Sequence, residues 1–381
     1  MRQVLILADE SADWIVAGLR QLERLLCALD ESLREPAKVW VVWDPRLSSD
    51  RRWLPRERNF TQLEVCELDV TPEDKLPAVE IVLETRLFLY RQSGASESLL
   101  ATMAQARAER RTYAQHLAAL QITWERSRAT DGWEYLTDAA QIPACEKRFL
   151  RGSGKSQDGL ISRFINRPIS RVMSRALLKT PVTPSAWTLS IFLLPLAGAA
   201  FLTRGDYTSV IVGLLFFQLY SILDGCDGEI ARAKYIESRR GRQLDTWCDT
   251  LGNLLLVVGL GYGLSRQTAP STFYFIESII VAILIVTNEL LLAAPAPSPK
   301  RADGALYPRH QQMVERSGLN FLGERFVWWL VQLTKRDVAL LAFLFIAWAG
   351  RPAWILHLLG AVAAISSLLA VTSFARSKLA R

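Results

Sequence analysis

Four aspartates stand between two apolar runs of the chain: Asp224, Asp227, Asp245 and Asp249. The run before them reads YTSVIVGLLFFQLYSI, and the run after them reads TLGNLLLVVGLGYGL. Ionisable groups at a membrane edge are costly and tend to mark functional sites. The spacing of three residues in the first pair and four in the second places each pair on one face of a helix. Two such helices facing each other would bring four carboxylates together.

Carboxylates gathered in this way indicate a site for divalent cations. Like charges so close cannot all stay ionised without a compensating cation, and carboxylate oxygens suit hard ions such as Mg²⁺ or Mn²⁺. Two ions in an acidic site stabilise the attacking and leaving oxygens of a phosphoryl transfer. Gly228 leaves room for a ligand near the backbone, and Arg232 offers a guanidinium to a phosphate. Solvated acids at a helix end would explain two of the aspartates, but not all four.

The string D-x-x-D-G-x-x-A-R, eight residues, G-x-x-x-D-x-x-x-D resembles the signature of the CDP-alcohol phosphotransferase family of membrane enzymes. The resemblance implies six transmembrane helices, a homodimer, and transfer of a phospho-alcohol from a CDP-linked donor to a hydroxyl acceptor with release of CMP. It implies two metal ions, Mg²⁺ or Mn²⁺, held by the four aspartates. Asp249 would also act as the general base. The implied nucleotide-binding residues are Asp224, Gly228, Ala231, Arg232 and Gly241.

A further stretch, DGLISRFINRPISRVMSR, together with DGCDGEIARAKYIES, is similar to the family branch of di-myo-inositol-phosphate-phosphate synthases. In that branch a nucleotidyltransferase domain precedes the membrane domain. A sugar-nucleotide transferase follows its first strand with a glycine-rich loop, whereas here VLILA runs into DESADWIVAG. We therefore expect a reduced relative that has lost nucleotidyl transfer.

Residues 1–150 are expected to form this small cytoplasmic α/β domain. Strand-like runs cover residues 4–8, 38–43 and 78–84, and helical patterns cover residues 14–34 and about 95–120. Alternation of this kind favours a parallel or mixed sheet with packed helices. The apolar run at the N-terminus is too short for a signal peptide.

Residues 151–184 are interpreted as a linker and an amphipathic juxtamembrane helix. The segment GSGKS at 152–156 lacks the earlier glycine of a phosphate-binding loop, because that position is Phe149. Arginines follow at a spacing of four, which predicts a cationic face lying on an anionic membrane surface; they are Arg163, Arg167, Arg171 and Arg175.

Residues 185–381 are expected to form a six-helix membrane domain. The apolar segments lie at about 185–203, 206–223, 246–264, 272–294, 337–350 and 353–374. With the N-terminus inside, the loops and tail from residue 163 onward hold twenty Lys and Arg residues on the cytoplasmic side and three on the other. This asymmetry predicts that both termini and the aspartates face the cytoplasm, in the cytoplasmic membrane.

The net charge of +7 suggests anionic lipid or phosphorylated substrates as partners, and no nucleic-acid-binding motif is present. The five cysteines lack the spacing of a zinc site. An ion-coupled transporter or a catalytically silent membrane protein is the alternative. A transporter favours acids near the bilayer midplane, whereas these aspartates lie at its edge. A phosphorylated acceptor would need a basic site, for which Arg325, Lys335 and Arg336 are candidates.

Overall fold

The computed structural model describes residues 2–33, 35–91, 111–126, 132–152, 161–267, 272–293 and 335–379. The chain divides into two compact units. The first comprises Met1–Ser153 together with two short later segments, Arg175–Pro181 and Ala231–Ile236. The second comprises Gly154–Ser174, Val182–Ile230 and Glu237–Arg381.

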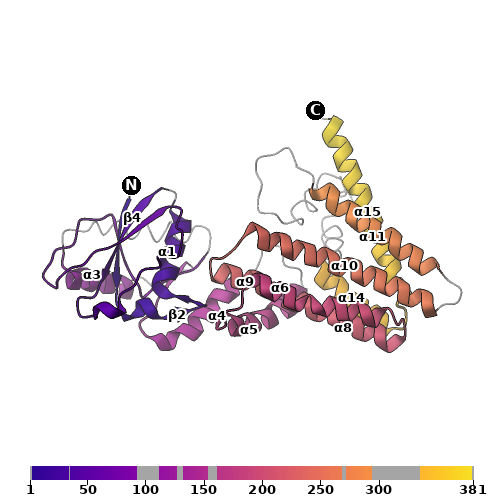
Figure 1. Cartoon of the computed structure of the whole chain (residues 1–381), viewed down its shortest axis with the longest axis horizontal. Coiled ribbons are helices and arrows are strands. Elements are labelled where there is room, and N and C mark those ends of the chain that lie inside the picture. The colour runs from indigo at the N-terminus through magenta and orange to yellow at the C-terminus, as the bar shows by residue number, and fades with distance from the viewer. Residues whose placement is uncertain are drawn as a thin grey trace. The chain divides into compact units, whose positions relative to one another are not determined.

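The N-terminal unit is built on a four-stranded parallel sheet, ordered β5-β4-β1-β6 (Figure 1). Its strands are β1 (Arg2–Ala8), β4 (Ala37–Trp43), β5 (Leu63–Glu67) and β6 (Ile81–Glu84). Val4 of β1 pairs with Val39 on one side and Ile81 on the other. The continuous apolar runs of β1 and β6 are typical of strands covered on both faces. The three predicted strands are present, and β5 is an additional one.

The remaining elements of this unit are short. They are α1 (Gln21–Ser32), α3 (Tyr113–Arg126), α4 (Ile142–Gly152), the antiparallel pair β7 (Leu87–Leu89) and β8 (Trp133–Tyr135), and the 3-10 turns η1 (Glu10–Asp13), η2 (Ser49–Arg51) and η3 (Ala139–Gln141). Helix α1 packs against β5 and β7, and α3 packs against β6. Of the second predicted helix, residues 95–110 lie outside the described part, and α3 covers its end.

The prediction of one helix over residues 14–34 is wrong at its start. Residues 15–20 form a hairpin of β2 (Ile15–Val16) and β3 (Leu19–Arg20), and α1 begins only at Gln21. The hairpin turn consists of Ala17 and Gly18, with φ of 47° and 81°. Two consecutive positive φ values fit a tight hairpin turn and cannot continue a helix.

The second unit is helical. Its elements are η4 (Ser162–Asn166), α5 (Arg167–Leu178), α6 (Pro184–Ile191), α7 (Leu193–Leu202), α8 (Tyr207–Leu223), α9 (Gly225–Ala233), α10 (Arg239–Gln267), α11 (Phe273–Ala293), α14 (Arg336–Trp348) and α15 (Ala353–Leu379), of which α5 and α9 run into the first unit. Among the described residues, four helical stretches are long and apolar enough to cross a membrane: Pro184–Leu202, Tyr207–Ala233, Arg239–Gln267 and Phe273–Leu290. These correspond to the first four predicted spans.

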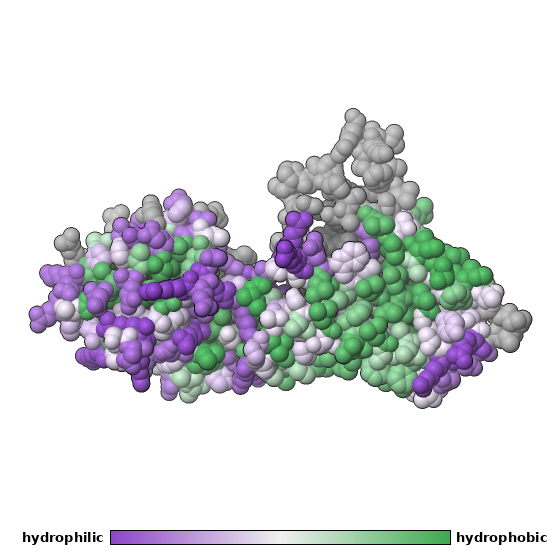
Figure 2. Space-filling model, viewed as in Figure 1, coloured by the Kyte–Doolittle hydropathy of each residue, from purple (hydrophilic) through white to green (hydrophobic). Residues whose placement is uncertain are grey.

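The helices of the second unit pack in sequence-adjacent and distant pairs. Helix α7 packs on α8, α10 on α7 and α11, and α15 on α11. A shared core includes Leu214 of α8, Leu260 of α10 and Leu356 of α15, none of which is exposed. Hydrophobic residues also cover much of the outer surface of these helices in the view of Figure 2. Such an apolar exterior is the one expected of helices that contact lipid.

One of the four arginines predicted to form a cationic outer face, Arg167 of α5, is buried instead. Arg167 is only 7% exposed and its Nη1 lies 3.0 Å from Oε1 of the fully buried Glu229 on α9. Gly225 makes this approach possible, because a Cβ there would lie 2.9 Å from the Arg167 guanidinium. Phe164 and Val172 are also largely exposed, beside the exposed Arg163. An arginine on this helix is satisfied inside the protein because a buried partner carboxylate faces it.

Candidate active site

Three of the four aspartates converge in the helical unit. Asp224 lies at the junction of α8 and α9, and Asp245 and Asp249 lie one turn apart on α10. One carboxylate oxygen from each falls within 4.8 Å of the others. The i, i+4 spacing on α10 keeps two of these side chains on one face, and the end of α8 supplies the third.

The cluster has the donor set of a divalent-cation site. The Oδ1 atom of Asp224 is shielded from solvent and accepts no hydrogen bond from the described residues. A buried carboxylate oxygen without a partner is costly, and so are three acids this close together. An oxygen-seeking ion such as Mg²⁺ or Mn²⁺ would relieve both costs, so these residues fit such an ion.

Two further side chains contact the cluster from one side. The Tyr220 hydroxyl donates to Oδ1 of Asp249 at 3.2 Å, and Nη1 of Arg336 donates to the same oxygen. The Arg336 guanidinium also stacks over the Tyr220 ring, 4.7 Å from its centroid. Sequence reasoning missed Tyr220, although its position one helical turn before Asp224 was a usable signal. Arg336, a sequence candidate for binding a phosphorylated acceptor, contacts Asp249 of this cluster, and its role toward the acceptor stays a prediction.

Comparison with known proteins agrees with this geometry. Residues 182–363 match the family model described as CDP-alcohol phosphatidyltransferase. This segment contains all three clustered aspartates and the whole signature. Residues 182–363 form a CDP-alcohol phosphatidyltransferase domain.

The chain is similar to a bifunctional IPC transferase and DIPP synthase of Rubrobacter xylanophilus, with 36% identity over 173 residues. That match covers 45% of this chain and 38% of the relative, so the chain spans well under half of that protein's length. It is also 28% identical to a phosphatidylinositol phosphate synthase of Mycobacteroides abscessus, over 41% of this chain and 70% of the relative. The apo crystal structure of the Mycobacterium tuberculosis phosphatidylinositol phosphate synthase aligns with a TM-score of 0.37 and 19% identity, over 53% of this chain and 93% of that one.

The fourth aspartate of the phosphatidyltransferase signature lies in a different environment. Oδ2 of Asp227 accepts a hydrogen bond from the Thr188 hydroxyl of α6 at 2.6 Å, and Oδ1 accepts one from the N–H of Gly228. Asp227 is only 8% exposed and is not a member of the three-aspartate group. Its predicted role as a metal ligand stays a prediction, and Thr188 is a neighbour that the sequence pattern did not identify.

The other predicted residues of the phosphatidyltransferase domain are distributed over two helix ends. Gly228, Ala231 and Arg232 lie on α9, and Ala231 and Arg232 belong to the first compact unit. Gly241 lies in the first turn of α10, where its N–H donates to the Ser238 hydroxyl at 2.9 Å. Lys335 immediately precedes α14, whereas Arg325 lies outside the described residues.

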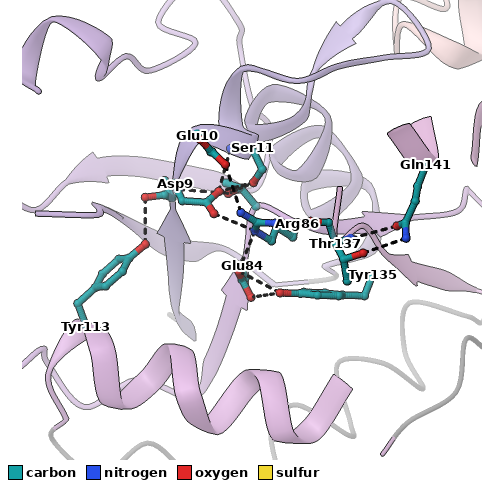
Figure 3. Close-up of polar contacts among 11 residues, drawn as sticks. Asp9, Glu10, Ser11, Glu84, Arg86, Tyr113, Tyr135, Thr137 and Gln141 are labelled. Atoms are coloured by element: carbon teal, nitrogen blue, oxygen red, sulfur yellow. Dashed lines mark hydrogen bonds and ion pairs between the residues drawn. The ribbon is translucent and has the colours of Figure 1, made fainter. Parts of the chain in front are cut away.

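The N-terminal domain that precedes the phosphatidyltransferase domain has a polar cluster at the carboxyl end of its sheet (Figure 3). Asp9 follows β1, and its Oδ1 accepts hydrogen bonds from both the N–H and the hydroxyl of Ser11, at 2.8 and 2.5 Å. Oδ2 of Asp9 lies 2.8 Å from Nε of Arg86, which is also 3.6 Å from Oε1 of Glu84. The Tyr135 hydroxyl donates to both oxygens of Glu84, at 3.2 and 3.1 Å.

This edge is where open parallel sheets commonly bind nucleotides. Here the carboxylate of Asp9 accepts a hydrogen bond from the backbone N–H of Ser11. In a phosphate-binding loop, such an N–H would face the ligand. Arg86, a cation that would suit a phosphate, is already paired with Asp9. The polar groups at this edge therefore bond to one another, and two carboxylates, Asp9 and Glu84, lie beside the cation Arg86. This arrangement disfavours binding of a triphosphate.

Proposed function

We propose that the chain is a divalent-metal-dependent membrane enzyme that moves a phospho-alcohol group from a CDP-linked donor to an alcohol hydroxyl and releases CMP. The observation that carries the proposal is the convergence of Asp224, Asp245 and Asp249, within a matched phosphatidyltransferase domain, to less than 4.8 Å between ligand atoms. When bound there, one or two Mg²⁺ or Mn²⁺ ions would neutralise charge on the phosphates. Asp227 is included as a further candidate ligand.

The residues around the cluster suit the steps of this reaction. Asp249 accepts the proton of the acceptor hydroxyl while the acceptor oxygen forms a bond to the donor's β-phosphorus. The bond between that phosphorus and the bridging oxygen breaks, and CMP leaves. Arg336, which already contacts Asp249, lies where it can bind an anionic oxygen of the acceptor or of the transferred phosphate. Gly228, Ala231, Arg232 and Gly241 are proposed to bind the cytidine nucleotide.

The substrate class is proposed from the relatives' names. A phosphatidylinositol phosphate synthase and bifunctional IPC transferase and DIPP synthases are among the proteins that the chain resembles. An inositol or inositol-phosphate acceptor with a lipid or a soluble CDP-alcohol donor follows from that similarity. Arg336 favours a phosphorylated acceptor, because a guanidinium binds a phosphate at two points. The product belongs to the synthesis of phospholipids or of polar phosphodiesters.

The architecture of the enzyme is proposed from the sequence. Six spans, of which four meet the expected length and hydropathy among the described residues, would place both termini and the aspartates on the cytoplasmic side of the cytoplasmic membrane. A homodimer follows from the family resemblance alone. Residues 1–150 are proposed to be a reduced nucleotidyltransferase-like domain, supported by the acidic, self-paired edge around Asp9.

The test is a CMP-release assay of the purified full chain in detergent. CDP-diacylglycerol and CDP-inositol serve as donors, each with inositol and inositol phosphate as acceptors, with and without Mg²⁺ or Mn²⁺. The proposal predicts CMP release that needs one donor, one acceptor and the metal. A chain that binds the metal and these nucleotides but releases no CMP from any pair would contradict it.

A further inference from the structure

The C-terminal end of helix α9 folds as part of the N-terminal unit. Residues 231–236 belong to that unit, although Ala231 and Arg232 carry the last positions of the first half of the signature. The N–H of Ile236 donates to the carbonyl of Ala231 at 3.0 Å, and Tyr235 adopts a φ of 51°. These features are those of a Schellman motif, the helix end in which glycine usually occupies the left-handed position.

Tyr235 holds this conformation without being glycine. A left-handed backbone is unfavourable for a residue with a side chain, so neighbouring contacts have to stabilise it. The Arg91 and Arg24 guanidinium groups lie over the Tyr235 ring, 4.9 and 5.8 Å from its centroid. Cation–π contacts of this kind are attractive, and more so when partly desolvated.

Three arginines of the N-terminal domain bind the carbonyls at this helix end. Nη2 of Arg24 donates to Ala233 O at 2.8 Å, and Nη1 of Arg91 donates to Arg232 O at 3.2 Å. Arg58 donates to Lys234 O at 2.8 Å and to Tyr235 O at 3.0 Å. The last carbonyls of a helix lack partners within the helix and carry the negative end of its dipole, so cations stabilise them.

Helix α1 organises all three arginines. Arg24 is itself on α1, fully buried, and also donates to Val16 O and Ala17 O of the hairpin. Glu23 of α1 accepts from Nε of Arg58 at 2.6 Å. Glu31, in the last turn of α1, accepts from Nε of Arg91 at 2.7 Å. One helix therefore fixes the geometry of four hydrogen bonds to residues 232–235.

The hairpin tip contacts both later segments of the same unit, Arg175–Pro181 and Ala231–Ile236. A Cβ on Gly18 would lie 2.9 Å from Leu178 O and 2.8 Å from the Lys234 side chain, so only glycine fits there. Nζ of Lys234 donates to Thr180 O at 3.0 Å. The ends of α5 and α9 are thus joined to each other and to the hairpin.

We propose that the N-terminal domain positions the nucleotide-binding end of the signature helix, with Arg58 and Arg91 as positioning residues that act through residues 232–235. Its role in transfer rests on the proposed function above. Because Arg232 lies in the last turn of α9 and within the same compact unit as these arginines, fixing that helix end restrains Arg232. The domain then serves the transferase as a scaffold, independently of any nucleotidyl-transfer activity of its own.

The test compares Arg58→Ala with Arg52→Ala in the full chain. Arg52 is the control, because like Arg58 it binds a carboxylate, Asp69 at 2.8 Å, and a backbone carbonyl, Leu47 O at 3.2 Å, and these partners lie outside residues 231–236. Two readouts are measured: amide hydrogen exchange of peptides covering residues 231–236, and KM for the CDP-linked donor and for the acceptor. Arg58→Lys is the conservative variant, and Gly18→Val disturbs the same contact from the hairpin.

We expect Arg58→Ala to speed exchange in residues 231–236 and to raise the donor KM about ten-fold, as the loss of charged hydrogen bonds implies. The acceptor KM should stay within about two-fold, Arg58→Lys should recover part of the loss, and Arg52→Ala should resemble the wild type. Unchanged exchange in a folded Arg58→Ala protein would show that Arg58 does not hold residues 231–236. Faster exchange with an unchanged donor KM would overturn the positioning role. A wild-type chain without CMP release would contradict the proposed function instead. The exchange result would then test only whether Arg58 holds residues 231–236.

Discussion

Arg336 at the start of α14 donates to the same oxygen of Asp249 as does Tyr220. Asp249, the proposed general base, is thus bound by Arg336, a cation from a distant part of the sequence. The pair places a positive charge beside the acidic cluster, where it would compete with a metal ion for the Asp249 carboxylate. This arrangement predicts two separable consequences of removing the guanidinium.

Replacing Arg336 by alanine should lower maximal CMP release about 10- to 100-fold, because a charge-assisted hydrogen bond to the base or to a phosphate is lost. The Mg²⁺ concentration needed for half-maximal activity should fall, since a competing cation is gone. The measurement is CMP release over a Mg²⁺ titration. Arg351→Ala, just beyond the opposite end of α14, is the control and should match the wild type. Unaltered turnover and metal dependence in Arg336→Ala would refute the role.

Glu84 gives the N-terminal domain a pH-dependent stability. Burial and the charge of Asp9 raise its pKa to about 7 from the usual 4.5, against the opposing effects of Tyr135 and Arg86. An acid with a raised folded-state pKa binds more protons folded than unfolded between those values. The free energy of unfolding should therefore decrease as the pH rises from about 4.5 to about 7, by at most about 3 kcal/mol.

Glu84→Gln should remove most of that pH dependence while keeping an oxygen that accepts from Tyr135. The measurement is proteolysis of the full chain in urea at several pH values, with fragments of residues 2–91 quantified. The ratio of variant to wild type cancels the protease's own pH response. The variant should be more resistant than the wild type at pH 8 and similar to it at pH 4. Equal resistance at both pH values would argue against a protonated Glu84.

The N-terminal domain should not make a CDP-alcohol. The Asp9 carboxylate already takes the Ser11 N–H and pairs with Arg86, leaving the sheet edge acidic. We expect the full chain to release no pyrophosphate from CTP with an alcohol phosphate and Mg²⁺. Release that requires the alcohol phosphate, and that Asp9→Ala abolishes, would show that nucleotidyl transfer persists.

Topology is tested by tags introduced into the full chain. Sites after residue 381 and within residues 237–242 should be cytoplasmic, and sites beside Arg266 or Arg351 should be external, because of the excess of Lys and Arg predicted inside. Labelling of intact cells with a membrane-impermeant reagent distinguishes the two sides. An external C-terminus would be incompatible with six spans.

Local patterns in the sequence were enough to predict the strands around Val4 and Val39 and the position of Asp245 and Asp249 one turn apart on α10. Their periodicity and spacing are local and survive folding. The hairpin at Ala17 and Gly18 was hidden, because apolar residues on both sides continue a helical pattern that the turn interrupts.

Contacts between distant segments were not predictable in this way. The Arg336–Asp249 pair joins residues 87 positions apart, and Arg167–Glu229 joins residues 62 apart. Arg167 reads as a membrane-facing cation until the buried carboxylate of Glu229 is placed beside it. The bond from Thr188 to Asp227 is likewise invisible to a signature that records only spacing.

The most direct measurement of the central claim is metal-dependent CMP release by Asp224→Asn, Asp245→Asn and Asp249→Asn. Asp206→Asn is the control, because that aspartate only caps the opposite end of α8, accepting from the N–H of Ser209 at 3.0 Å. We expect each site variant to lose at least about 100-fold in CMP release. Excess metal should partly restore Asp224→Asn and Asp245→Asn but not Asp249→Asn, whereas Asp206→Asn should stay active. Folded site variants that all release CMP at the wild-type rate would contradict the account.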